Sequence, residues 1–189
     1  QKPFALRDIF RMRCFSEIRF PLAELPPLPR AGGPLDTCAL AKIIASDSTQ
    51  RIVSGFTSGP IRYRLEFASR KVDVLFVRAI AEKVYSARPE LLNDSREALW
   101  EVSLRESAGG IRVELCPRIR PDPRFVYRRA DVPAASHPPL AAAMACLAGL
   151  GENERVWDPF CGSGLELVEC ALKGHISVVF GCDLSSDAV

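Results

Sequence analysis

The fold of the C-terminal part of this chain is decided by the stretch Val156-Trp157-Asp158-Pro159-Phe160-Cys161-Gly162-Ser163-Gly164-Leu165-Glu166. An apolar run typical of a strand leads into a turn with two glycines, and the turn opens directly onto a helical pattern. Gly162 and Gly164 allow backbone conformations that other residues avoid, and they let a ligand approach closely. The first turn of a helix also presents unpaired N–H donors. We therefore predict a strand–turn–helix unit that binds a small molecule.

An acidic residue, Asp183, follows the next predicted strand, residues 176–180. A carboxylate in that position can accept hydrogen bonds from both hydroxyls of a ribose, as in dinucleotide-binding βαβ units. The turn lacks the Lys-Ser/Thr pair of a phosphate-binding P-loop and does not read G-x-G-x-x-G. Asp158 at the strand tip would repel a phosphate and suits a ligand with a positive amino group. The alternative is a tight turn that binds nothing.

An α+β pattern precedes this unit. Residues 61–67 alternate apolar and charged side chains, which predicts a half-buried strand. Residues 74–85 have apolar side chains at helical spacing, and two β-rich runs, 100–104 and 111–115, flank a Gly-containing hairpin turn. The residues expected in the core of this region are Ile80, Val84 and Leu91.

The first sixty residues are less regular. Residues 15–20 are consistent with a short strand, and Asp36 could cap a helix over residues 38–45, because its carboxylate can accept from the free N–H groups of a first turn. Residues 117–136 form a connector rich in proline and arginine.

Beyond the connector, the pattern predicts a helix over residues 138–150, a strand around 155–157, a helix over 164–172 and the strand at 176–180. We therefore predict an α/β fold class, with an N-terminal α+β part followed by the start of a Rossmann-like domain. The expected regions are residues 1–60, 61–125 and 126–189.

The net charge gives no argument for a nucleic-acid partner. The 189 residues include 25 Lys and Arg against 23 Asp and Glu, for a net charge of +2, so only local clustering can indicate such a partner. Residues 118–129 interleave five arginines with two aromatic residues, a combination that can contact phosphates and stack on bases. A solvated linker with locally paired charges explains the pattern equally well. The candidate RNA contacts are Arg118, Arg120, Arg124, Arg128 and Arg129.

The seven cysteines are odd in number, widely spaced and without a C-x-x-C pair. This argues against a disulfide framework or a zinc site and favours a reducing compartment. We expect most of these thiols to be small buried apolar groups. We also expect a cytoplasmic location, with an organelle as the alternative. No apolar run reaches the ~18 residues of a membrane span. The first residues, Gln1-Lys2-Pro3-Phe4, suggest an internal or trimmed terminus.

The stretch Asp158–Gly164 resembles the cofactor motif of class I methyltransferases that modify exocyclic amino groups of RNA bases. The resemblance extends upstream to Tyr127-Arg128-Arg129 and to residues 133–141, which read Pro-Ala-Ala-Ser-His-Pro-Pro-Leu-Ala. Residues 61–120 look like a THUMP domain, an RNA-binding module found beside these catalytic domains. Overall the chain most resembles the THUMP-containing tRNA and ribosomal RNA guanine-N2 methyltransferases.

This resemblance implies S-adenosyl-L-methionine as the cofactor, a structured RNA as the partner, and no metal. His137 could be a general base, but its place next to Pro138 at a predicted helix start favours a structural or cofactor-lining role. Cys161 has no recognisable basic partner nearby, and the family uses this position for packing, so we do not expect a nucleophile. The implied cofactor-binding residues are Asp158, Pro159, Phe160, Cys161, Gly162, Ser163, Gly164 and Asp183, with Ser136 and His137 beside them.

The sequence departs from this family in one respect. Amino-methylating members carry a later Asp/Asn-Pro-Pro-Tyr/Phe motif that grips the amino group, and this chain has none before its last residue, Val189. We therefore expect the N-terminal part of a longer enzyme, inactive alone, with its catalytic residues beyond Val189. The rival interpretations are a non-catalytic RNA-binding scaffold with a vestigial fold and a DNA adenine-N6 methyltransferase. A downstream Asn/Asp-Pro-Pro-aromatic motif would exclude the scaffold, and the THUMP-like region favours RNA.

Overall fold

The computed structural model describes residues 6–27, 35–68, 73–107, 109–119, 122–128 and 135–185. The chain divides into two compact units. The first unit comprises residues 1–9 and 17–119, and the second comprises residues 10–16 and 120–189. Both units combine helices and strands, so the predicted α/β class is confirmed.

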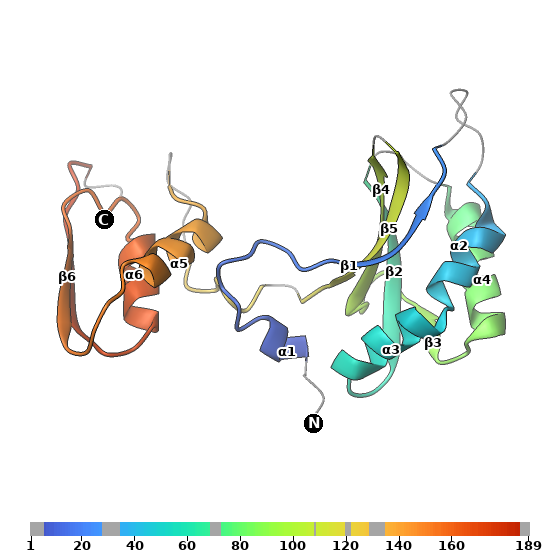
Figure 1. The fold of residues 1–189 in the computed structure, drawn as a ribbon, viewed down its shortest axis with the longest axis horizontal. Helices are drawn as coiled ribbons and strands as arrows, with labels where there is room; N and C mark the ends of the chain where they lie inside the picture. The colour runs from blue at the N-terminus through green and yellow to red at the C-terminus, as the bar shows by residue number, and fades with distance from the viewer. Residues whose placement is uncertain are drawn as a thin grey trace. The chain divides into compact units, whose positions relative to one another are not determined.

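The first unit is built on a mixed five-stranded sheet in the order β1-β5-β4-β2-β3 (Figure 1). The hairpin β4–β5 is antiparallel, as is the β1–β5 pair, whereas β2 runs parallel to both β3 and β4. The strands are β1 (Phe20–Leu25), β2 (Ile61–Phe67), β3 (Leu91–Asn93), β4 (Trp100–Ser107) and β5 (Gly110–Pro117).

One face of this sheet is apolar and is covered by helices. Ile61, Tyr63 and Leu65 on β2 are buried, whereas Arg62 and Arg64 point to the opposite face, as the alternation of the sequence predicts. The helices that lie on one side of the sheet in Figure 1 are α2 (Thr37–Ile44), α3 (Asp47–Phe56) and α4 (Val74–Ala87). The residues predicted for the core, Ile80, Val84 and Leu91, are all buried.

Short polar side chains set the starts of these helices. Asp36 Oδ1 accepts a hydrogen bond from Cys38 N at 2.8 Å, so the predicted cap of α2 is confirmed. Helix α3 was not predicted, because its sequence DSTQRIVSGF contains few apolar residues and a glycine. Its start is nevertheless encoded locally, since Ser46 Oγ accepts from Thr49 N at 3.2 Å.

Two features of the N-terminal region differ from the sequence prediction. The strand expected over residues 15–20 begins only at Phe20, and residues 10–16 belong to the second unit. Residues 1–60 also do not form a separate region, because β1 pairs with residues 111–115 of β5 and so completes the same sheet. Pairing between strands so distant in sequence leaves no local signal, which is why the predicted boundary at residue 60 is wrong.

The second unit is a parallel βαβ arrangement with one further helix. Strands β6 (Glu154–Asp158) and β7 (Ile176–Gly181) pair in parallel and are connected by α6 (Leu165–Leu172). Helix α5 (Pro138–Leu147) packs against α6, and a four-residue helix, α1 (Leu6–Ile9), lies near the start of the chain. In the described ranges no helix has both the length and the apolar character that a bilayer span requires.

Candidate cofactor site

The Gly-rich turn follows β6 and leads into α6, as the sequence predicts. Asp158 ends the strand, and its Oδ1 accepts from Phe160 N at 2.9 Å. Gly162 (φ 51°) and Gly164 (φ 71°) both lie in the left-handed region, and Gly164 is the N-cap of α6. A Cβ atom built on either glycine would meet no heavy atom within 4 Å. Both positions therefore face open space that a ligand could occupy.

Three hydrogen bonds join this turn to the end of β7. Cys182 N donates to Asp158 O at 3.1 Å, Cys161 N donates to Cys182 O at 3.0 Å, and Gly162 N donates to Asp183 Oδ2 at 2.9 Å. Because β6 and β7 are parallel neighbours, their C-terminal ends bring Asp158 and Asp183 to the same edge of the sheet. The predicted acidic pair is thus assembled by backbone geometry.

Backbone N–H groups stabilise the ionised carboxylate of Asp183. Its Oδ1 accepts from Ser185 N at 2.9 Å, and the N–H groups of Ser185 and Gly162 hold the pKa of the carboxyl below its ordinary value. Each carboxylate oxygen has two acceptor sites, so both oxygens can accept one further hydrogen bond. The carboxylate therefore suits a ligand with two adjacent hydroxyls, and the open glycine positions suit close contact by that ligand.

A cavity of about 470 Å³ lies along the turn and the inner side of α6. Its walls are largely apolar and include neither Asp158 nor Asp183. The cavity therefore lies beside the edge of the sheet that carries these two carboxylates, which we call the acidic edge, and does not coincide with it. The residues that line it are Cys161, Gly162, Ser163, Gly164, Leu167, Val168, Ala171, Leu172, Val179 and Gly181.

Gly181 is a residue of this site that the sequence analysis missed. A Cβ atom at this position would lie 2.7 Å from both Cys161 Sγ and Leu167 Cδ1, so any other residue would force these two side chains to shift. Cys161 itself is buried, and burial, followed by the charges of Asp158 and Asp183, raises the pKa of its thiol. This environment agrees with the packing role expected for Cys161 and argues against a nucleophile.

The remaining predicted cofactor residues flank the turn and α5. Pro159 is half-buried, whereas the ring of Phe160 is 77% exposed. His137 is the N-cap residue of α5, without a capping hydrogen bond from its side chain, and Ser136 precedes it. Among the described residues, no hydrogen bond connects Ser136 or His137 to the turn, so their place beside a cofactor stays a prediction. The same ranges contain no cluster of His, Cys, Asp and Glu that could bind a metal ion.

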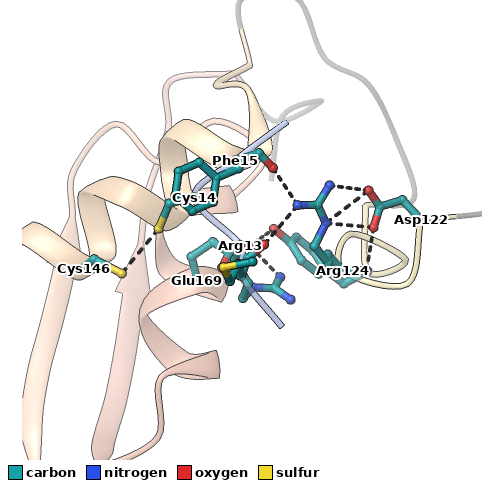
Figure 2. Close-up of polar contacts among 9 residues, drawn as sticks. Arg13, Cys14, Phe15, Asp122, Arg124, Cys146 and Glu169 are labelled. Carbon is teal, nitrogen blue, oxygen red and sulfur yellow. Dashed lines mark hydrogen bonds and ion pairs between the residues drawn. The ribbon is translucent and has the colours of Figure 1, made fainter. Parts of the chain in front are cut away.

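Arg124, predicted to contact RNA, has a structural role instead (Figure 2). Its side chain is only 4% exposed, and its Nη1 donates to the carbonyls of Met12 at 3.0 Å and Phe15 at 2.6 Å. Its Nη2 donates to Ser16 O at 3.1 Å and to Asp122 Oδ2 at 2.7 Å. A buried guanidinium with these partners has no face left for a phosphate. The prediction for Arg124 is therefore corrected, because the sequence could not reveal its distant backbone partners.

The other candidate RNA contacts are divided between the two units and the residues outside the described ranges. Arg118 follows β5 in the first unit, is half-buried, and donates its backbone N–H to Leu99 O at 2.7 Å. Arg128 is half-buried in the second unit. Arg120 and Arg129 lie outside the described residues. Contact of these four arginines with RNA stays a prediction.

A buried carboxylate on α6 connects three distant segments of the second unit. Glu169 is 2% exposed, and its two oxygens accept from Arg13 Nη2 at 2.7 Å and Arg13 Nε at 2.8 Å. Tyr127 donates its hydroxyl to Glu169 Oε1, and the Arg13 guanidinium also lies 5.8 Å from the centroid of the Tyr127 ring. Burial and the carboxylate of Glu169 together raise the pKa of Tyr127 to about 12. Residues 10–16 and 122–128 are thus attached to the helix that begins at the Gly-rich turn.

We expect the Arg124→Lys variant to release residues 10–16 from the second unit. A lysine ammonium is a compact charge and cannot reproduce the planar fork that bonds three carbonyls and a carboxylate. Limited trypsin digestion should therefore cleave after Arg11 and Arg13 several-fold faster than in the wild type. The matched control is Arg112→Lys on an exposed position of β5. Equal cleavage rates at these two sites in both variants and the wild type would contradict the role assigned to Arg124.

Comparison with known proteins agrees with this geometry. Residues 126–181 match a family model described as RMKL-like, methyltransferase domain, and the match contains the turn and both strands. The chain is similar to TrmN from Thermus thermophilus, with 22% identity and a TM-score of 0.57 over 96% of this chain and 53% of that one. It is also similar to a predicted N6-adenine-specific DNA methylase from Listeria monocytogenes, with 17% identity and a TM-score of 0.55 over 89% of this chain and 45% of that one.

The chain thus spans about half the length of these two proteins. At such identities the structural likeness shows a shared fold, and the family model matches only residues 126–181 of this chain. The segment around the Gly-rich turn is therefore similar in sequence to a methyltransferase domain, and the chain shares its fold with the two proteins above.

Proposed function

We propose that this protein is an S-adenosyl-L-methionine-dependent methyltransferase that acts on an exocyclic amino group of RNA, guanine N2 of a tRNA or ribosomal RNA. The main support for S-adenosyl-L-methionine as the cofactor is the acidic edge beside the Gly-rich turn. Gly162 and Gly164 face open space, and Asp183 and Asp158 lie at the ends of neighbouring parallel strands. Few ligands other than a nucleoside with a cationic tail would use all of these groups.

Each of these residues has a distinct task in the proposal. Asp183 accepts hydrogen bonds from the two ribose hydroxyls, while the N–H groups of Gly162 and Ser185 keep its carboxylate oriented. Asp158 contributes negative charge toward the methionine ammonium and disfavours phosphate-bearing ligands. S-adenosyl-L-methionine, when bound, supplies an electrophilic methyl group on its sulfonium. The chain's contribution is to position that group for in-line attack by a flipped-out base.

The first unit supports a nucleic-acid partner through one pair of arginines. Arg105 and Arg112 are opposite each other in the β4–β5 register, and both are exposed. Like charges placed opposite each other destabilise a hairpin, and a bound phosphate would relieve this repulsion. Glu24 lies opposite Arg112 on β1 and balances one of the two charges. By contrast, Arg62 on β2 is already paired, at 2.6 Å from Asp94 and 2.8 Å from Glu97.

The cofactor assignment is tested by calorimetric titration of S-adenosyl-L-methionine into this chain and, if the gene encodes a longer product, into that product. We expect the full-length protein to bind and Asp183→Ala to lower the affinity at least tenfold, because hydrogen bonds to a charged group contribute about 1.5–3 kcal/mol each. Glu152→Ala, an exposed carboxylate before β6, is the matched control and should bind like the wild type. Absence of binding by the full-length wild type would contradict the proposal.

The choice of RNA over DNA is tested by measuring binding of tRNA and of duplex DNA as a function of salt. We expect tighter binding to tRNA, and we expect Arg105→Gln/Arg112→Gln to weaken it and to reduce the salt slope by about 1–2. Arg62→Gln should leave the slope unchanged, because its charge is neutralised within the first unit. Tighter binding to DNA, with methyl transfer to adenine N6, would favour the alternative function instead. This alternative is considered because the similar Listeria monocytogenes protein is described as a predicted N6-adenine-specific DNA methylase.

A further inference from the structure

Two of the seven free thiols of this chain face each other across the second unit. Cys14 Sγ on segment 10–16 lies 3.6 Å from Cys146 Sγ on α5, although 132 residues separate them in the sequence (Figure 2). Cys146 is exposed and Cys14 is half-buried, so a small solute can reach the pair. Of the seven cysteines only Cys161 and Cys170 are buried, so the expectation that most of the thiols are buried is wrong.

The surroundings of the two thiols make them chemically unequal. They line a cavity of about 370 Å³ together with Lys173 and Glu169. The ammonium of Lys173, followed by the Cys14 thiol, lowers the pKa of Cys146, although Glu169 opposes this effect. Burial, followed by the Cys146 sulfur, raises the pKa of Cys14. At neutral pH, Cys146 is consequently the better nucleophile, and Cys14 keeps its proton.

The position of Cys14 is fixed by its neighbours on both sides. Arg13 forms the two-point ion pair with buried Glu169, and Arg124 bonds the carbonyls of Met12 and Phe15. Little conformational freedom remains to be lost when the two sulfurs join. Joining them requires the two sulfurs to approach from 3.6 Å to a bond length of about 2.05 Å.

We propose that Cys14 and Cys146 form a reversible disulfide when the protein meets a peroxide, and that this bond fastens segment 10–16 to α5. The Cys146 thiolate attacks one peroxide oxygen, so that an S–O bond forms, the O–O bond breaks, and the leaving oxygen takes up a proton. The resulting sulfenic acid is attacked by the Cys14 sulfur, which forms the S–S bond and releases water. Two electrons pass from the two sulfurs to the peroxide. A dithiol reductant restores both thiols by exchange.

The other cysteines in this unit are in different environments. Cys161 and Cys170 are buried, and burial raises the pKa of both thiols. Cys182 is exposed, and its Sγ lies 3.4 Å from Pro159 O. These differences make Cys182 a suitable reference thiol for the pair.

The test is to oxidise the full chain with hydrogen peroxide at neutral pH, alkylate the remaining thiols, digest with trypsin without reduction, and analyse the peptides by mass spectrometry. Trypsin releases peptides 14–19 and 130–155, each with a single cysteine, so a cross-link between them identifies the pair. We expect this cross-linked peptide, its loss after dithiothreitol and its absence from Cys14→Ser. Cys182→Ser should form it like the wild type.

A second variant tests the chemistry and not the proximity alone. Lys173→Gln removes the charge that favours the Cys146 thiolate, and we expect it to slow formation of the cross-link several-fold at neutral pH. An unchanged rate would overturn the assignment of Cys146 as the attacking thiol. Recovery of both peptides fully alkylated, under peroxide that oxidises Cys182, would overturn the proposal itself.

Discussion

The candidate site depends on one hydrogen bond, from Gly162 N to the carboxylate of Asp183. This bond joins the turn after β6 to the residue that follows β7, and two backbone hydrogen bonds through Cys182 support it. The donor, Gly162, has a left-handed backbone conformation that favours glycine, and the N-cap of α6, Gly164, follows two residues later. The same bond fixes the orientation of Asp183. The positions of Gly162, Asp183 and the N-terminus of α6 are therefore linked locally, without a ligand.

Helix α6 connects the Gly-rich turn to the rest of the second unit. It begins at Gly164, and its buried Glu169 pairs with Arg13 and Tyr127. A buried carboxylate that lost its arginine would carry an uncompensated charge, which is strongly destabilising. This ion pair therefore ties residues 10–16 to the helix that carries the turn. The thiol pair is close to this ion pair. Cys14 follows Arg13 directly, and Cys146 belongs to α5, which packs against α6.

Local patterns in the sequence were sufficient for much of this structure. The alternation of residues 61–67, the cap at Asp36 and the turn at 158–164 were all predictable, because each depends on neighbours within a few residues. The joint position of Asp158 and Asp183 was also predictable, since neighbouring parallel strands end at the same edge of a sheet. Gly181 was missed although a glycine at a strand end indicates close backbone approach, and that signal was available.

The features that could not be predicted all rest on distant partners. Strand β1 is defined by its pairing with β5, and the burial of Arg124 depends on carbonyls more than one hundred residues away. An arginine-rich connector looks the same in sequence whether its charges contact RNA, solvent or the protein's own backbone. Arg124 shows that the last of these occurs here.

The central claim, that the Asp183 carboxylate accepts ribose hydroxyls, is tested most directly by a double-mutant cycle. Binding of S-adenosylhomocysteine and of its 2′-deoxy analogue is measured for full-length wild type and for Asp183→Ala. We expect the wild type to discriminate between the two ligands by about tenfold or more and the variant to lose most of this discrimination. If both proteins discriminate equally, Asp183 does not contact the 2′-hydroxyl, and the ribose is bound elsewhere.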